Sequence, residues 1–525
     1  MTTIATLLEW SRRKQKFRLF PLLAGLLLVA ATLFFSFFGI TRSLWLDEAS
    51  SVYIANNNLA GVMANMKDNC HTPPFYYLLL SVWMHVFGAG EPAVRSLSAV
   101  FYVLSLFVMY RLGTELHNKK TGLLSSFLYM ISPAAVVHVQ NARMYTLLGF
   151  LGILSTLFFF RLFSANTASR KDLVAYIIVN IVGSFTHYWF FFLLFAQTVS
   201  YAVLLYGNTV RKFLAAMLLS TAPFFILWSR ILLIQMTNGG TSWMTKPNPS
   251  VLVSTVLGFY GGGKTGALVY AALLFSVLVD VRRFAIGIQN LAQLKVFFLE
   301  KQNLALLLFL FLSLLVPFLI SQVSPIYVEN RYTIIALFPL VVLLASLLGR
   351  FANPKLVIFF CLLLLAGVSF GFVKSRLTRH PHTDMSTADY LIEQANDKDI
   401  FLFTGLSRTA VEYYLRLRKP DKNFIKISFP LEMEIHPAWI DEKKMLGEKD
   451  RLAREADQVV ERLDTLLVKN DSRIWVLYGI YAQTSRPLIE RLDQHCRLVK
   501  RIKLKDPFYT FYNEILVYQK KSASS

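Results

Sequence analysis

Eleven apolar segments, each of about 20 residues, are the feature that most constrains how this chain can fold. A helix of that length spans the hydrocarbon core of a bilayer. Of the 525 residues, 55% are hydrophobic and only 16% are charged, against roughly 25% charged in soluble domains. We therefore predict an α-helical polytopic membrane protein, with helices at residues 18–40, 93–113, 119–137, 144–163, 173–189, 189–207, 212–234, 265–281, 304–322, 331–349 and 355–373.

Basic residues between these segments predict the orientation of the chain. Clusters such as Arg12-Arg13-Lys14, Lys119-Lys120, Arg170-Lys171 and Arg282-Arg283 all fall on one side when the helices are counted in this way. The positive-inside rule makes that side cytoplasmic. The net charge of +22 is thus explained by membrane orientation, and nucleic acid is not an expected partner. We expect a multi-pass protein of the bacterial inner membrane, with a cytoplasmic N-terminus and a periplasmic C-terminal domain.

The composition changes sharply near Lys374, where charged residues begin to occur throughout. Strand-like segments alternate there with helix-like ones, which predicts a small α/β domain. The strands are expected at 400–404, 473–478, 498–504 and 510–518, and the helices at 408–418, 450–469 and 485–495. This gives a membrane domain at 1–373 and an extracytoplasmic domain at 374–525. An outer loop at 41–92 is expected to hold two short surface helices, near 48–66 and 75–86.

Polar side chains gather at the outer ends of the predicted helices rather than in their middles. A transporter places its binding groups near the bilayer midplane, so a site at one face favours an enzyme that acts on a lipid head group. A lipid or solute transporter is the non-enzyme alternative. The candidate site residues are Asp47, Glu48, His71, Arg95, Asn141, Arg143, Tyr145, His187, Tyr188, Lys264, Arg331 and Tyr332.

The chemistry of the strongest candidates suits group transfer. Asp47 and Glu48 follow the first helix, where a carboxylate can act as a general base, although the same pair fits a solvated helix start. Arg143 and Arg331 lie on the outer side, against the positive-inside trend, and guanidinium groups suit bidentate phosphate contacts. Interfacial anchoring is the alternative for both arginines. His71 with Asp47 or Glu48 also fits a divalent-metal site, so metal dependence is left open.

Taken in order, several segments resemble a known group of membrane enzymes. They are Leu44–Glu48, His71–Leu80, Glu91–Ser98, Ser132-Pro133, Gln140–Tyr145, Thr186–Tyr188 and Asn330–Tyr332. This pattern resembles the GT-C glycosyltransferases, in the branch (glycosyltransferase family 39-like) that includes protein O-mannosyltransferases and the lipid A aminoarabinose transferase. The resemblance covers about residues 20–350. Asn141 departs from it, because relatives often carry an acidic residue there.

The resemblance implies a GT-C fold and an inverting glycosyltransferase. Such an enzyme would move a hexose or pentose from a polyprenyl-phosphate carrier to a hydroxyl of a protein, lipid or glycan at the outer membrane face. Asp47 would be the general base, and Glu48 would orient it or help to bind a metal. Arg143, Arg331, Tyr145 and Tyr332 would contact the donor phosphate, and His71, Arg95, Asn141, His187, Tyr188 and Lys264 would line the site. An oligosaccharide ligase with a lipid-diphosphate donor is the closest alternative.

Overall fold

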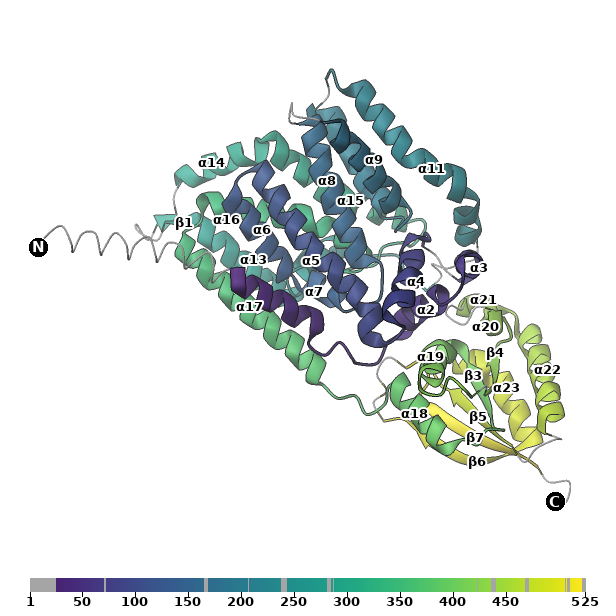
Figure 1. Cartoon of the computed structure of the whole chain (residues 1–525). Coiled ribbons are helices and arrows are strands. Elements are labelled where there is room, and N and C mark those ends of the chain that lie inside the picture. The colour runs from purple at the N-terminus through teal and green to yellow at the C-terminus, as the bar shows by residue number, and fades with distance from the viewer. Residues whose placement is uncertain are drawn as a thin grey trace, which may run out of the picture.

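The computed structural model shows a helical body with a smaller α/β domain at one end (Figure 1). It describes residues 25–521 except for 70–71, 165–168, 206, 238–242, 281–284, 287, 423, 436–440, 468–471, 506 and 508–509. His71 and the basic cluster at Arg12–Lys14 therefore lie outside the described residues.

Each of the eleven predicted membrane segments coincides with one helix or with two consecutive ones. These are Gly25–Phe37, α5 (Glu91–Leu116), α6 (Lys119–Met130) with α7 (Pro133–Val139), α8 (Tyr145–Phe163), α9 (Arg170–Ser184), α10 (Phe190–Ser200) with the π-helical turn η1 (Tyr201–Leu205), α11 (Val210–Thr237), α13 (Gly263–Leu278), α15 (Lys301–Ser321), the 3-10 turn η2 (Tyr332–Ala336) with α16 (Leu337–Phe351), and α17 (Pro354–Leu377). Among the described residues, six helices are long and apolar enough to span a bilayer alone. The pair α6–α7 makes a seventh if its 62° bend lies within one span.

Close helix contacts in this body depend on small residues. α5 and α6 pack side by side, and a Cβ atom at Gly122 would lie only 2.2 Å from the Thr114 hydroxyl and 2.4 Å from the Tyr110 carbonyl. Helices in lipid gain little from burying apolar side chains, so close backbone approach through glycine is a common source of packing energy. The bend between α6 and α7 has a local cause, because Pro133 begins α7 and cannot donate a helix hydrogen bond.

The outer loop holds three helices rather than the two predicted: α2 (Leu46–Ala55), α3 (Leu59–Asn69) and α4 (Phe75–Phe87). The helix expected near 48–66 is interrupted by asparagines. The Asn57 side chain donates to the carbonyls of Tyr53 and Ile54, at 2.8 and 3.2 Å, and the Asn58 side chain accepts from the Gly61 amide at 2.8 Å. These bonds replace helical ones, so α2 ends and α3 begins.

Three further elements connect the membrane helices: α12 (Ser250–Gly258), a hairpin of β1 (Val279–Asp280) and β2 (Ala285–Ile286), and α14 (Ile288–Leu299).

The C-terminal domain contains a five-stranded sheet of order β4-β3-β5-β7-β6. β3 is parallel to β4 and β5, and β7 is antiparallel to β5 and β6. Its elements are α18 (Asp384–Gln394), β3 (Ile400–Thr404), η3 (Gly405–Ser407), α19 (Arg408–Arg418), β4 (Ile425–Phe429), α20 (Glu432–Ile435), α21 (Glu442–Gly447), α22 (Lys449–Leu467), β5 (Arg473–Tyr478), α23 (Ala482–His495), β6 (Cys496–Lys503) and β7 (Glu514–Lys520). The predicted strands and helices are all present, whereas α18, β4 and the short helices α20 and α21 were not predicted.

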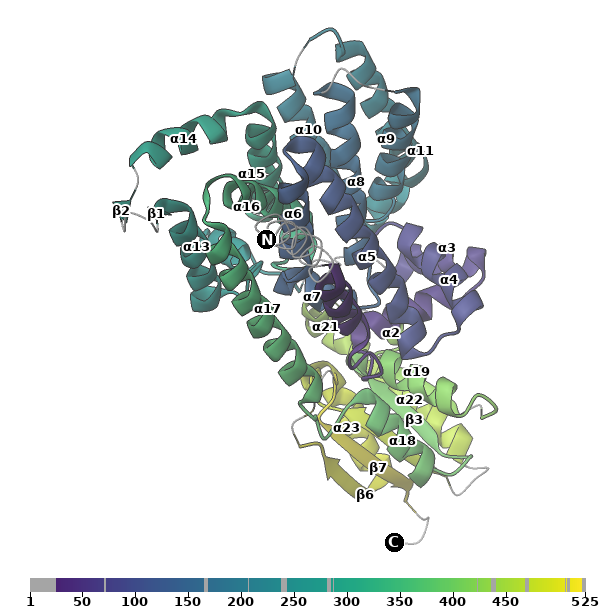
Figure 2. The same ribbon diagram turned by 60° about the vertical axis from the view of Figure 1, so that its left-hand side comes forward.

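Helices cover both faces of this sheet. Phe401 and Phe403 of β3 pack with α18 and α19 on one face, and Ile400 and Leu402 pack with α22 and α23 on the other. The predicted domain boundary at 373 falls in the last turns of α17, which ends at Leu377. α19 packs directly on α2 of the outer loop, as both views show (Figures 1 and 2). The C-terminal domain therefore contacts the segment that carries the predicted catalytic residues.

Candidate active site

The first turn of α2 carries the two candidate carboxylates. Glu48 folds back to accept a hydrogen bond from the Trp45 amide at 3.4 Å, which is one half of a capping box. Acidic residues in a first turn are also favoured by the helix dipole. The two neighbours then diverge, because successive residues on a helix point about 100° apart. Glu48 is buried, whereas the Asp47 side chain is 27% exposed.

Glu48 forms a buried ion pair with Arg95 of α5. The Arg95 Nε lies 2.8 Å from one Glu48 oxygen and its Nη2 lies 2.6 Å from the other. The rest of the guanidinium donates to the carbonyls of Ile40, Arg42 and Ser43, at 2.7, 2.6 and 3.1 Å. This arrangement fixes the loop that leads into α2. Arg95 and Glu48 thus lie buried against each other, while Asp47 takes the accessible position in this turn. The roles of Glu48 in metal binding and of Arg95 in lining the site stay predictions.

Asp47 faces a second arginine in a more open setting. Its Oδ2 lies 3.3 Å from Nη1 of Arg331, whose side chain is 38% exposed. The Arg331 guanidinium also lies over the ring of Trp45, 4.8 Å from the centroid, a contact that favours a cation. Asp47 and Arg331 are 284 residues apart in the chain. The structure therefore brings the predicted base and one predicted phosphate contact together.

Arg143 approaches the same place from the segment before α8. Its Nη1 lies 3.4 Å from the Asp47 carbonyl, 3.3 Å from the Ser51 hydroxyl and 3.3 Å from the Tyr77 hydroxyl. Asn141, just before it, accepts from the Trp45 indole at 3.4 Å. Glu48 and Arg95 neutralise each other. Two guanidinium groups and one accessible carboxylate therefore meet around Asp47, and the net positive charge suits an anionic ligand.

Aromatic rings complete one wall of the site. Tyr332 lies 4.8 Å from His187 and 6.3 Å from Tyr145, centroid to centroid. His187 and Tyr145 are 6.4 Å apart, and the Trp189 ring lies 5.9 Å from Tyr332. The cluster joins residues from the start of α8, the α9–α10 connection and η2. Three predicted residues, Tyr145, His187 and Tyr332, are therefore brought together.

Other predicted residues are not placed in this cluster. Tyr188 points toward α11, where its hydroxyl donates to Gln235 at 2.5 Å and accepts from the Trp228 indole at 3.0 Å. The partners of its hydroxyl thus belong to α11 rather than to the aromatic cluster, and its role as a site residue stays a prediction. Lys264 is exposed in the first turn of α13, beside Thr265, which lines a separate apolar cavity. Among the described residues, no three His, Cys, Asp or Glu side chains group closely enough to hold a metal ion.

The prediction missed three contributors to the site. Trp45 supplies the surface beneath Arg331, while Ser51 and Tyr77 offer oxygen atoms to Arg143. Ser51 follows Asp47 by one helical turn, a spacing that places both on the same side of a helix. Trp45 and Tyr77 lie within the segments that carry the family resemblance, which was the available signal.

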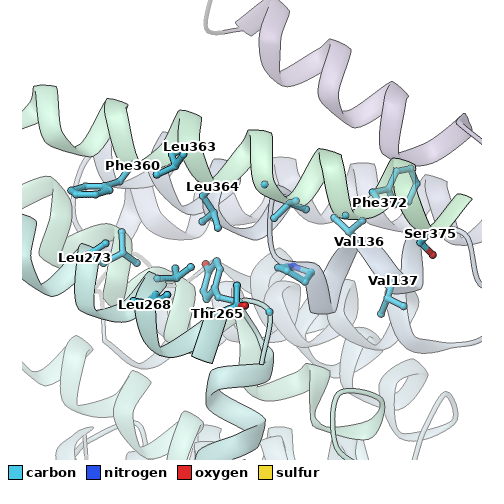
Figure 3. Close-up of a pocket in the computed structure, with 18 of the residues that line it drawn as sticks. Val136, Val137, Thr265, Leu268, Leu273, Phe360, Leu363, Leu364, Phe372 and Ser375 are labelled. Atoms are coloured by element: carbon cyan, nitrogen blue, oxygen red, sulfur yellow. The ribbon is translucent and has the colours of Figure 1, made fainter. Parts of the chain in front are cut away.

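An apolar cavity of about 710 Å³ lies between α7, α13 and α17 (Figure 3). Val136, Leu268 and Leu364 are among the side chains that line it. At its outer end Arg376 donates to the Gln140 side chain at 3.1 Å, and Gln140 immediately precedes Asn141 of the site. We call Asp47, Arg143 and Arg331 the Asp47 cluster. The cavity therefore approaches the Asp47 cluster through the chain segment that follows α7.

Comparisons with known proteins agree with this architecture. Residues 71–234 match the family model described as dolichyl-phosphate-mannose-protein mannosyltransferase. No curated protein matches the chain significantly in sequence. The structure is similar to ArnT from Cupriavidus metallidurans in the apo state, with a TM-score of 0.61 and 13% identity, over 94% of this chain and 97% of that one. For ArnT bound to undecaprenyl phosphate the TM-score is 0.57, again at 13% identity, over 95% and 98%. The predicted GT-C fold with a C-terminal domain is confirmed.

Proposed function

We propose that this chain, which the family model and the shared fold indicate to be a membrane glycosyltransferase of the GT-C superfamily, transfers a sugar from a polyprenyl monophosphate to an acceptor hydroxyl with inversion. The observation that carries the proposal is the placement of Asp47 between two arginines: Arg331 contacts its carboxylate and Arg143 contacts its backbone carbonyl. A partly exposed base can accept the proton of the acceptor hydroxyl, and two neighbouring cations can bind the phosphate of the donor. The accessible charge balance also favours a lipid phosphate over a neutral ligand.

In the transfer step the acceptor oxygen attacks the anomeric carbon from the face opposite the phosphate. The new carbon–oxygen bond forms as the bond to the phosphate oxygen breaks, and the acceptor proton passes to Asp47. The electron pair leaves with the polyprenyl phosphate. Arg331 and Arg143 stabilise the charge that grows on this leaving group, which is where electrostatic catalysis gains most.

The contact between Asp47 and Arg331 suggests an order of events. In the structure one oxygen of the Asp47 carboxylate is occupied by the Arg331 guanidinium. A donor phosphate offers Arg331 a stronger, bidentate partner. Binding of the donor would then draw Arg331 from Asp47 and leave the carboxylate ready to accept the proton. The exposed fractions of 38% for Arg331 and 27% for Asp47 leave room for this exchange.

The apolar cavity supports a lipid-linked donor. Its lining by α7, α13 and α17 suits an isoprenoid chain, which has no polar group to satisfy. Arg376 at the outer end carries the charge that complements a phosphate. The related ArnT has been solved with undecaprenyl phosphate bound. We propose that the prenyl tail of the donor occupies this cavity while its head group reaches the Asp47 cluster.

We propose that the reaction takes place at the extracytoplasmic face of a bacterial inner membrane. The basic residues between the helices assign the opposite side to the cytoplasm. The Asp47 cluster lies at the end of the helical body that carries the C-terminal domain (Figure 1), so the same assignment puts both outside. The acceptor is a hydroxyl of a protein, lipid or glycan.

The decisive experiment measures transfer by the purified full-length protein from a panel of polyprenyl-monophosphate sugars, with membrane extract as acceptor. Asp47→Asn keeps the size of the side chain and removes the base, so we expect a loss of kcat of about a thousandfold or more. The matched control is Asp457→Asn, which removes an acid from α22 that pairs only with Arg491 among the described contacts. This control should transfer at the wild-type rate.

Two additional arms test the alternatives. Diphosphate-linked donors should be inactive, and activity with these alone would support an oligosaccharide ligase instead. A chelator tests whether a divalent metal takes part. Full activity of a folded Asp47→Asn protein would remove Asp47 from its role as the base.

A further inference from the structure

The C-terminal domain makes direct contacts with the loop that carries Asp47. The Tyr414 hydroxyl, from α19, accepts a hydrogen bond of 2.7 Å from the amide of Leu44. Its neighbour Tyr413 donates to the Ala89 carbonyl at 2.8 Å, just before α5 begins. The Leu46 side chain, which directly precedes Asp47, is buried in the hydrophobic core of the C-terminal domain. Three separate contacts thus join this domain to the first turn of α2 and its surroundings.

These contacts complete the support of a short stretch of backbone. Arg95 binds the carbonyls of Ile40, Arg42 and Ser43 from the membrane domain, and Tyr414 binds the Leu44 amide from the opposite domain. Leu44 is fully buried, so its amide has no water to replace the tyrosine. A buried amide left without a partner is costly, and the loop would move to satisfy it.

We propose that Tyr414 is a positioning residue for catalysis and that the C-terminal domain holds the loop that carries Asp47 in place. This inference rests on the proposed function, because it takes Asp47 as the base. The phosphate contacts come from Arg143 and Arg331, which belong to other segments of the chain. A loosened loop therefore misplaces the base without removing the groups that bind the donor. Its effect falls on kcat rather than on the KM for the donor.

The test compares Tyr414→Phe with Tyr518→Phe in the full-length protein. Tyr414→Phe keeps the buried ring and removes only the hydroxyl that accepts from Leu44. Tyr518→Phe removes a hydroxyl that donates to Asp493 at 2.8 Å inside the same domain, away from the loop. We expect kcat to fall roughly tenfold in Tyr414→Phe with an unchanged donor KM, because one buried hydrogen bond is lost. Tyr518→Phe should keep the wild-type kcat.

Hydrogen–deuterium exchange provides a readout that does not depend on activity. In Tyr414→Phe the peptide that covers Ile40–Asp47 should exchange faster than in the wild type, while the strands of the C-terminal sheet exchange as before. Tyr518→Phe should leave the loop peptide unchanged. Tyr413→Phe, which removes the bond to Ala89, should have a smaller effect on the same peptide.

The outcomes separate this inference from the proposed function. Wild-type kcat and unchanged loop exchange in Tyr414→Phe would overturn the inference, even if Asp47→Asn is inactive. An equal fall of kcat in Tyr414→Phe and Tyr518→Phe would also overturn it, because the effect would then come from general loosening of the domain. Full activity of Asp47→Asn would instead contradict the proposed function, whatever the exchange experiment shows.

Discussion

Two adjacent carboxylates of helix α2 lie in opposite environments. Glu48 faces the protein interior, where Arg95 binds both of its oxygens at 2.8 and 2.6 Å. Asp47 faces an open site, where one of its carboxylate oxygens lies 3.3 Å from Arg331. The buried pair is fixed, since each guanidinium nitrogen of Arg95 already has acceptors. The open pair leaves oxygen and nitrogen atoms available for a substrate.

The difference shows how neighbouring acids can divide their work. A base must exchange its partner during the reaction, so a loose and partly exposed pair suits Asp47. The loop that holds this base needs an ion pair that stays formed during the reaction. The pair of Glu48 with Arg95 meets this need, because it is buried and fully hydrogen-bonded. With Asp47 as the proposed base, the motif Asp47-Glu48 would combine one catalytic and one structural carboxylate, and the following predictions test that division.

The largest expected effect comes from breaking the buried pair. Arg95→Met leaves the Glu48 charge buried without its cation, which typically costs about 3–5 kcal/mol. We expect a lower yield of folded protein and a marked fall in Tm in detergent. Arg161→Met, which removes one of the two arginine partners of the partly exposed Glu115, is the control and should change Tm little. An equal effect of the two substitutions would show that burial does not distinguish these pairs.

A second effect concerns Asp384, a buried acid with no cationic partner among the described residues. Burial raises the pKa of Asp384 to about 8, opposed by a hydrogen bond from Tyr512. A raised folded pKa means that the contribution of this group is fully present below the unfolded pKa of about 3.9. It is lost as the pH rises toward 8, at up to about 1.4 kcal/mol per pH unit. Asp384→Asn should flatten this dependence in pH-resolved unfolding of the full chain.

This pH series sharpens the comparison with Glu48, because the two acids differ in what neutralises their charge. Asp384 meets a phenol, whereas Glu48 meets a guanidinium. The prediction would be contradicted if the free energy of unfolding changed with pH between 5 and 8 at the same slope in the wild type and in Asp384→Asn.

The smallest expected effect tests the open pair. Arg331→Lys keeps the charge but removes the planar fork, so the bidentate phosphate contact and the stacking on Trp45 are weakened. We expect kcat to fall about tenfold, which is roughly 1.4 kcal/mol, with Tm unchanged. Steady-state kinetics with the best donor would measure this. Arg350→Lys, at the far end of α16 from the site, should keep the wild-type kinetics.

The sequence predicted the elements of this fold well because they depend on local patterns. The apolar length of each membrane segment and the alternation of residues after Lys374 are sufficient for helices and for most strands. The break between α2 and α3 was missed because it depends on side-chain bonds of Asn57 and Asn58. β4 (Ile425–Phe429) was missed because Lys426 interrupts its short apolar stretch.

The sequence predicted several residues of the candidate site, but not the directions in which their side chains point. Order along the chain indicated Asp47, Arg143 and Arg331, and the structure brings them together. It could not show that Glu48 points inward, because the reason is Arg95, 47 residues away. It also could not distinguish Tyr188 from Trp189 as the ring that faces the site, since the helix break between α9 and α10 sets their rotation.

The bond between Tyr414 and Leu44 joins residues 370 positions apart, and this separation has a consequence during synthesis. A ribosome releases the Asp47 loop long before it has made α19, and domains usually fold as units in the order in which they emerge. The membrane helices can thus insert and pack while the loop still lacks its last support. If Tyr414 positions the loop as proposed, the newly made chain would reach full activity only after the domain that carries α19 has folded against Leu44.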